Sequence, residues 1–207
     1  MSFTLKRGLD DIFVAEVTTD TAEEFVTGTP FKLIPAGEMN TTVDKDSSNY
    51  WFDNSVFAIV GREGASELGI TGAGMRANDV AKITGKDVDE ETGAVMDAGA
   101  YVEKYWALGA RKKNIDGTFE YFWFQKGSFA IPDEASKTEG EDTDATGTEL
   151  TYSAVQTIHK FAKSGKVSKR VIIDTETTKI NDDADWFAQV VTPDNLTTVC
   201  SKVSATA

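Results

Sequence analysis

The run Phe119-Glu120-Tyr121-Phe122-Trp123-Phe124-Gln125-Lys126-Gly127-Ser128-Phe129 decides the fold class of this chain. Alternate residues of a β-strand point to opposite faces, and here aromatic side chains occupy both alternating sets. Such a strand needs apolar cover on both sides, as in a β-sandwich or at a subunit contact. Directly before it, Asp116-Gly117 supplies the positive backbone angles of a tight hairpin turn. We therefore expect paired strands over residues 102–112 and 118–131.

The rest of the chain repeats the two-residue period of half-buried strands. Ser164-Gly165-Lys166 predicts a second hairpin, between strands at residues 149–163 and 167–176. Helical spacing appears twice, at residues 75–84 before Gly85 and at residues 182–191. Further strands are expected at residues 12–19, 31–35, 38–44, 56–62 and 67–72. The pattern is that of a mainly antiparallel β protein.

Length and composition indicate one folded domain with a short extension. The chain has 207 residues, of which 40% are hydrophobic and 10% aromatic, enough to bury a core. We place the domain at residues 1–193. Residues 194–207 are small and polar and predict a flexible C-terminal tail. Residues 133–149 hold seven acids and one lysine and predict a mobile loop.

Charge and cysteine content exclude several classes of protein. The chain has 34 acidic and 21 basic residues, a net charge of -13, which repels a phosphate backbone and argues against nucleic-acid binding. Cys200 is the only cysteine, so neither a disulfide framework nor a cysteine metal site forms within one chain. The opening residues lack the apolar stretch of a signal peptide, and no apolar run is long enough to span a membrane. We expect a soluble protein made in the cytoplasm.

The sequence offers little for catalysis. Gly72-Ala73-Gly74 imitates a dinucleotide fingerprint, but a dinucleotide site needs a parallel sheet with alternating helices. Because hairpins link most of the expected strands, we interpret these glycines as a turn between a strand and a helix. His159, the only histidine, is expected in a strand without a nucleophile at a recognisable spacing. The acids at residues 87–91 lack the spacing of a calcium loop, so a solvated charge run is the simpler interpretation. We predict no enzyme, no cofactor and no metal site.

Several segments, taken in order, resemble the major tail protein family of siphophages, the long-tailed non-contractile bacteriophages. The most specific is the aromatic run at residues 119–129, preceded by Tyr105-Trp106-Ala107-Leu108-Gly109-Ala110. The other similar segments are residues 8–17, 27–33, 83–89, 93–96, 137–139 and 185–187. Together they cover most of the chain from Leu9 to Pro193, with a poor match over residues 50–65.

The resemblance implies an antiparallel β-sandwich or partly rolled β-barrel with one flanking α-helix, long loops and a C-terminal extension. It implies a structural subunit of the virion tail, assembled in the host cytoplasm as rings of six that stack into a hollow tube. DNA would leave through the lumen without specific binding, which suits an acidic protein. The implied partners are further copies of the chain, a tape-measure protein, a tail terminator and a distal tail protein.

Candidate contact residues follow from exposed-aromatic and charge patterns. We expect residues 44–55 to form a loop that reaches a neighbouring ring, and the strand at residues 119–129 to lie at a subunit contact. Acids of the 133–149 loop are expected to meet basic residues of a neighbour. The candidates are Tyr50, Trp51, Phe52, Trp123, Phe129, Asp133, Glu139, Asp142, Lys166, Lys169 and Arg170.

The alternative is a monomeric β-sandwich binding module, such as a carbohydrate-binding or adhesin-like domain. In that interpretation the aromatic run at residues 121–124 would stack on sugars. Electron microscopy separates the two hypotheses, because only a tube subunit forms rings or tubes.

Overall fold

The computed structural model describes residues 3–96, 102–133, 147–181 and 185–200. The fold is mainly antiparallel β with few helices, consistent with a β-sandwich or partly rolled β fold, so the predicted fold class is confirmed. The elements are β1 (Lys6–Asp20), β2 (Phe25–Thr27), β3 (Phe31–Lys32), β4 (Ala36–Phe52), β5 (Ser55–Gly72), α1 (Ala77–Thr84), β6 (Asp87–Val88), β7 (Val95–Met96), β8 (Trp106–Asn114), β9 (Phe119–Phe129), β10 (Thr148–Val155), β11 (Arg170–Asp174) and α2 (Leu196–Val199).

One large sheet organises the described residues. Its strand order is β2-β1-β8-β9-β10-β5-β4, with β3 added to β1 and β11 added to β9, while β6 and β7 form a separate small hairpin. The predicted pairing of the strands around Asp116-Gly117 is confirmed, because β8 and β9 are antiparallel and Gly117 has φ +90°. Helix α1 also matches its prediction and ends at Gly85, which adopts φ +80°. Residues 72–76 link β5 to α1, as expected for a strand-to-helix turn.

The second predicted hairpin is wrong, because β10 and β11 do not pair with each other. Both lie against the same edge of β9, β10 along residues 126–129 and β11 along residues 120–124. Gln125 marks the split: its buried amide donates to the Val191 carbonyl at 3.0 Å and accepts from the Ser168 hydroxyl at 3.0 Å. Between the two strands the chain loops out, with only one isolated bridge, Phe161 to Lys166.

Apolar side chains pack on both faces of this sheet. Phe122 and Phe124 join a core with Trp106 and Tyr152, whereas Trp123 points the other way into a second core with Trp186. Gly109 lies opposite Trp123, and a Cβ there would be 2.5 Å from the indole ring, so only glycine leaves room. The two-sided burial expected of β9 is therefore present within a single chain.

The C-terminal segment differs from its prediction. Of the helix predicted at residues 182–191, residues 182–184 lie outside the described residues and residues 185–191 form turns and bends, although Trp186 and Val191 are buried as the apolar pattern suggested. The predicted loose tail instead holds helix α2, whose Val199 is buried and accepts a backbone hydrogen bond from Asn181 at 2.9 Å. Residues 194–200 of the predicted tail are therefore packed on the domain, and residues 201–207 lie outside the described residues. Composition hid this because the packing rests on a few small or medium side chains, Leu196, Val199 and Cys200.

Candidate assembly surfaces

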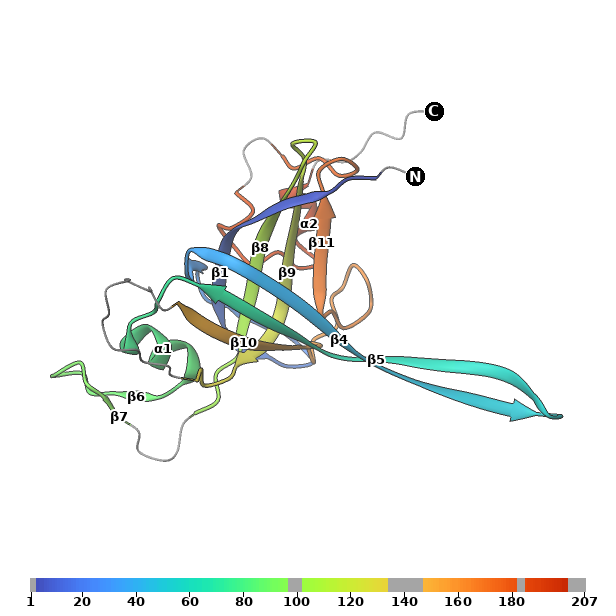
Figure 1. Ribbon diagram of the computed structural model, residues 1–207, viewed down its shortest axis with the longest axis horizontal. Helices are drawn as coiled ribbons and strands as arrows, with labels where there is room; N and C mark the ends of the chain where they lie inside the picture. Colours follow the sequence, from blue (N-terminus) through green and yellow to red (C-terminus); the bar gives the residue numbers. More distant parts are fainter. Residues whose placement is uncertain (1–2, 97–101, 134–146, 182–184, 201–207) are drawn as a thin grey trace, which may run out of the picture.

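The most prominent surface feature is a hairpin formed by the outer parts of β4 and β5, residues 45–63, which we call the arm. It projects away from the body of the molecule (Figure 1). Beyond the last pairs of β5 with β10, at Ser66, only β4 and β5 pair with each other. Asp53 and Asn54 close the arm with φ 47° and 64°, the two positive angles of a type I′ turn. The prediction of a loop at residues 44–55 is therefore corrected to strand and tight turn.

The end of the arm exposes large apolar side chains to an unusual extent. Tyr50, Trp51 and Phe52, the predicted contact residues, are 51%, 63% and 60% exposed. The opposite strand adds four exposed apolar residues: Val56, Phe57, Ile59 and Val60. An isolated two-stranded hairpin is marginal in water, and exposed patches of this kind mark interaction sites. The structure thus places the three predicted aromatics, exposed, at the end of the arm.

The four added residues were missed, although the sequence carried a signal for them. In residues 56–60 apolar side chains occupy both alternating positions, as in the run at residues 119–129. The period of two alone predicts an ordinary strand at residues 56–62. The difference is that β9 finds cover within the chain, and the arm finds none among the described residues.

The base of the arm is tied to the body by a basic residue. The Lys169 ammonium donates to the Glu63 carboxylate and to the Gly64 carbonyl, the latter at 3.1 Å. The hydrogen bond and the charge of Lys169 lower the pKa of Glu63 below its ordinary value. Lys169 was predicted to meet an acidic loop of a neighbour; it is instead engaged within its own chain.

The other two basic candidates are exposed. Lys166 lies in the loop between β10 and β11, and the Arg170 guanidinium lies 5.2 Å from the centre of the Phe124 ring. Asp133 is exposed as well, and Glu139 and Asp142 lie outside the described residues. Among the described residues, Asp133 forms no ion pair with Lys166 or Arg170.

Trp123 and Phe129 are corrected as contact candidates. Trp123 has no exposed surface and Phe129 is 7% exposed in the single chain. The Trp123 indole also donates to the Trp186 carbonyl at 3.2 Å. Residues 186–199 cover this face of β9, and side chains of the neighbouring strand β11 pack beside Trp123; the sequence pattern does not predict this cover. These side chains are inaccessible to a neighbour unless the core opens.

Open strand edges form a second kind of candidate surface. In the described residues, the outer edge of β4 has no partner strand, and neither has β5 at residues 55–65 on its side away from β4. At the other end of the sheet, β1 pairs only with β8 along residues 6–11. Unpaired edges present rows of free N–H and C=O groups that can pair with another chain.

The chemistry around His159 is structural. His159 lies in a loop and not in the predicted strand, with its ring edge-on to Phe161 at 5.1 Å. The Asp20 carboxylate accepts bonds from Lys126 at 2.8 Å and from the backbone amides of Ile158 and His159. Burial would raise the pKa of Asp20, but these hydrogen bonds outweigh burial and lower it. This cluster fastens the 156–169 loop to β1.

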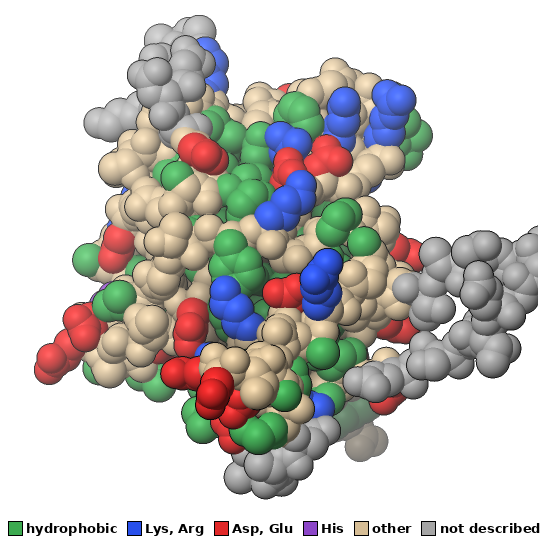
Figure 2. All heavy atoms as spheres, turned by 90° about the vertical axis from the view of Figure 1, so that its left-hand side faces the viewer, with side chains coloured by type: hydrophobic (Ala, Val, Ile, Leu, Met, Phe, Trp, Pro, Cys, Tyr) green, Lys and Arg blue, Asp and Glu red, His purple; other side chains and the backbone are tan. Residues whose placement is uncertain are grey.

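Among the acids at residues 87–91, Asp89 has a local structural role. Asp89 accepts two bonds of 2.6 Å from Thr92, which close the turn between β6 and β7 and lower the pKa of Asp89. Figure 2 shows the face opposite the arm, where acidic side chains gather at the lower end, toward β6 and β7. Among the described residues, no group of three metal-ligating side chains occurs.

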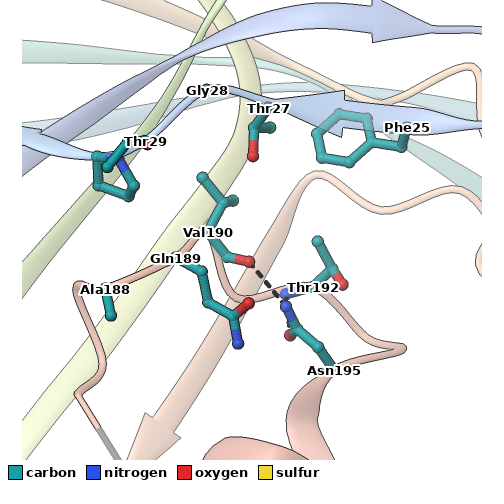
Figure 3. Close-up of a pocket in the computed structure, with 10 residues that line it drawn as sticks. Phe25, Thr27, Gly28, Thr29, Ala188, Gln189, Val190, Thr192 and Asn195 are labelled. Atoms are coloured by element: carbon teal, nitrogen blue, oxygen red, sulfur yellow. Dashed lines mark hydrogen bonds between the residues drawn. The ribbon is translucent and has the colours of Figure 1, made fainter.

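A pocket of about 330 Å³ lies between residues 25–30 and residues 188–195 (Figure 3). Thr27, Gln189, Thr192 and Asn195 give it a polar wall, and the Asn195 amide is held by the Val190 carbonyl at 2.9 Å. No lining residue is ionisable, so the pocket walls supply no acid–base pair.

Comparison with known proteins adds no assignment. No model of a known protein family matches the sequence, and no match was found among curated proteins. Within the described ranges, none of the helices combines the length and the apolar content needed to cross a membrane.

Proposed function

We propose that this chain is the tail tube subunit of a long-tailed, non-contractile bacteriophage, and not an enzyme. Copies of the chain form rings of six, and the rings stack into a hollow tube through which DNA is ejected. The observation that carries the proposal is the arm, a projecting hairpin with seven large apolar residues exposed and both strand edges free. The ordered resemblance of the sequence to siphophage major tail proteins supplies the family.

The distribution of open surfaces suits a subunit that assembles head to tail. The free edge of β4 and the free part of β1 lie at opposite ends of one sheet order. Two different surfaces on one chain generate heterologous contacts, which close into a ring at a suitable rotation and continue as a stack along an axis. The net charge of -13 keeps a passing phosphate backbone from adhering.

Electron microscopy of the purified chain tests this proposal. We expect rings or tubes, either spontaneously at high concentration or after addition of a tail-tip nucleus. Replacing residues 45–63 by Asn-Gly, between Asp44 and Gly64, should give a folded monomer that makes no tubes. A matched control, Ser48→Thr in the polar part of the arm, should assemble normally. Unaltered tubes from the arm deletion would contradict the proposal.

The alternative, a monomeric binding module, rests on one observation: Tyr50, Trp51 and Phe52 are exposed rings of the kind that stack on sugars. The aromatic run first considered for that role is largely buried in β9. Saturable binding in a glycan array by a protein that stays monomeric would favour this alternative.

A further inference from the structure

A second apolar patch is formed by the first described residues and by the turn between β8 and β9. Phe3, Leu5 and Ile115 are 89%, 71% and 60% exposed, and we call them the N-terminal patch. The Ile115 amide donates to the Leu5 carbonyl at 2.9 Å, which joins the start of the chain to the turn between β8 and β9. Together with Thr4 and Asp116, these residues line a hollow of about 190 Å³.

We propose that the arm tip of one copy docks into the N-terminal patch of another copy. This inference rests on the proposed function and names the surface that receives the arm. At the tip, the rings of Phe52 and Phe57 lie edge to face at 5.3 Å and form a compact apolar knob. A cavity of about 150 Å³ holds a benzene ring, so the hollow has room for one of these rings.

Cations outnumber acids around the N-terminal patch: two cations flank it, and the one acid that lines the hollow, Asp116, has its carboxylate engaged by hydrogen bonds from Thr118. Asp53 lies in the turn of the arm tip and is exposed. Arg7 and Lys113 flank the N-terminal patch and are exposed too. Within the described residues, none of these three makes an ion pair, whereas Lys6 nearby is already paired with Glu120. The tip acid can therefore meet a rim that carries free cations, which fixes the orientation of docking.

The occupant must be another copy. The arm points away from the body toward the lower right of Figure 1, whereas the start of β1 lies near the upper end of the molecule, apart from the arm tip. The polar pocket at residues 25–30 and 188–195 is a poorer receptor for a phenyl knob, because desolvating its polar wall costs free energy. A tip and a receptor at separate places let each copy contact two others, one through each surface.

Cross-linking in assembled tubes tests the docking. In a Cys200→Ser background, Ser55→Cys places a thiol at the tip and Thr4→Cys places one at the receptor. A short bismaleimide should then join copies into a ladder of multimers on a denaturing gel. The matched control combines Ser55→Cys with Thr27→Cys at the polar pocket and should give no ladder. Circular dichroism confirms that each variant folds.

The outcomes separate this inference from the proposed function. Tubes with a ladder only for the Ser55–Thr4 pair support the docking. Tubes without that ladder, or with a ladder only for the Thr27 control, overturn the docking and leave the tube assignment intact. A protein that makes no ring or tube under any condition, with or without a nucleus, overturns both.

Charge exchange gives an independent readout. Asp53→Lys should raise the critical concentration for assembly by about tenfold, because it sets like charges against Arg7 and Lys113. Adding Arg7→Asp and Lys113→Asp in the same chain should restore assembly toward the wild-type value. If the triple variant assembles worse than Asp53→Lys alone, the proposed pairing of these charges is wrong.

Discussion

Replacing Trp123 by alanine tests whether β9 belongs to the core of one chain or to a contact between chains. The Trp123 side chain has no exposed surface, packs over Gly109 and donates to the Trp186 carbonyl. Removing a buried aromatic ring of this size costs about 3–5 kcal/mol, the sum of the lost transfer free energy and the cavity left behind. That is a large part of the roughly 5–15 kcal/mol by which a domain is stable.

Urea unfolding of the monomer measures the loss. With a slope of about 3 kcal/mol per M, a loss of ~3–5 kcal/mol lowers the midpoint by roughly 1–1.7 M. Trp51→Ala is the matched control, because Trp51 is 63% exposed on the arm and its removal should change stability by less than about 0.5 kcal/mol. In tube assembly the order should reverse, with Trp51→Ala the more damaging of the two folded proteins. Equal monomer midpoints for both variants would refute the intrachain role of Trp123.

Three further predictions concern the body and the base of the arm. Asp20→Asn should destabilise the monomer by about 3 kcal/mol at neutral pH, because it leaves the buried Lys126 without its counter-charge. Since the pKa of Asp20 is lowered in the folded state, this difference should be complete above about pH 4 and shrink at lower pH as Asp20 is protonated; a difference that grows in acid would contradict the assignment. Gly109→Ala should lower the urea midpoint because the added Cβ overlaps the Trp123 ring, whereas Gly8→Ala, which meets no atom within 4 Å, should not. Lys169→Ala should speed hydrogen exchange at residues 45–63 without changing exchange in β8 and β9. If the variant changes the exchange rates of both regions by the same factor, Lys169 is not a tether at the arm base.

The parts of the fold that could be predicted are those fixed by local chemistry. Asp116-Gly117 fixes a hairpin because Gly117 adopts a positive backbone angle, φ +90°, that residues with a side chain rarely take, and Gly85 fixes the end of α1 for the same reason. Two-sided apolar patterning likewise identified β9 as a strand covered on both faces. These signals need no knowledge of distant residues.

The predictions that were wrong concern the pairing of segments that lie far apart in the sequence. Ser164-Gly165 has the composition of a hairpin turn, yet β10 and β11 each gain more by pairing with β9 than with each other. The burial of Trp123 could not be told apart from a subunit contact, because a sequence shows that a side chain needs cover and not which chain provides it. Helix α2 was missed because its four residues, Leu196–Val199, are too few to show a helical period in the sequence.

The separation of covered and uncovered apolar residues assigns folding and assembly to different parts of the chain. Both cores are closed by residues of the same chain, so the body can fold before it meets a partner. The arm and the N-terminal patch bury little in the single chain, and so they contribute little to folding and remain available for assembly. Variants in the cores should therefore shift the unfolding midpoint first, and variants in the arm should shift the concentration at which tubes appear. If the assembly defects of a set of arm variants scale with their loss of monomer stability, folding and assembly are coupled. The assignment of folding to the cores and of assembly to the arm would then be wrong.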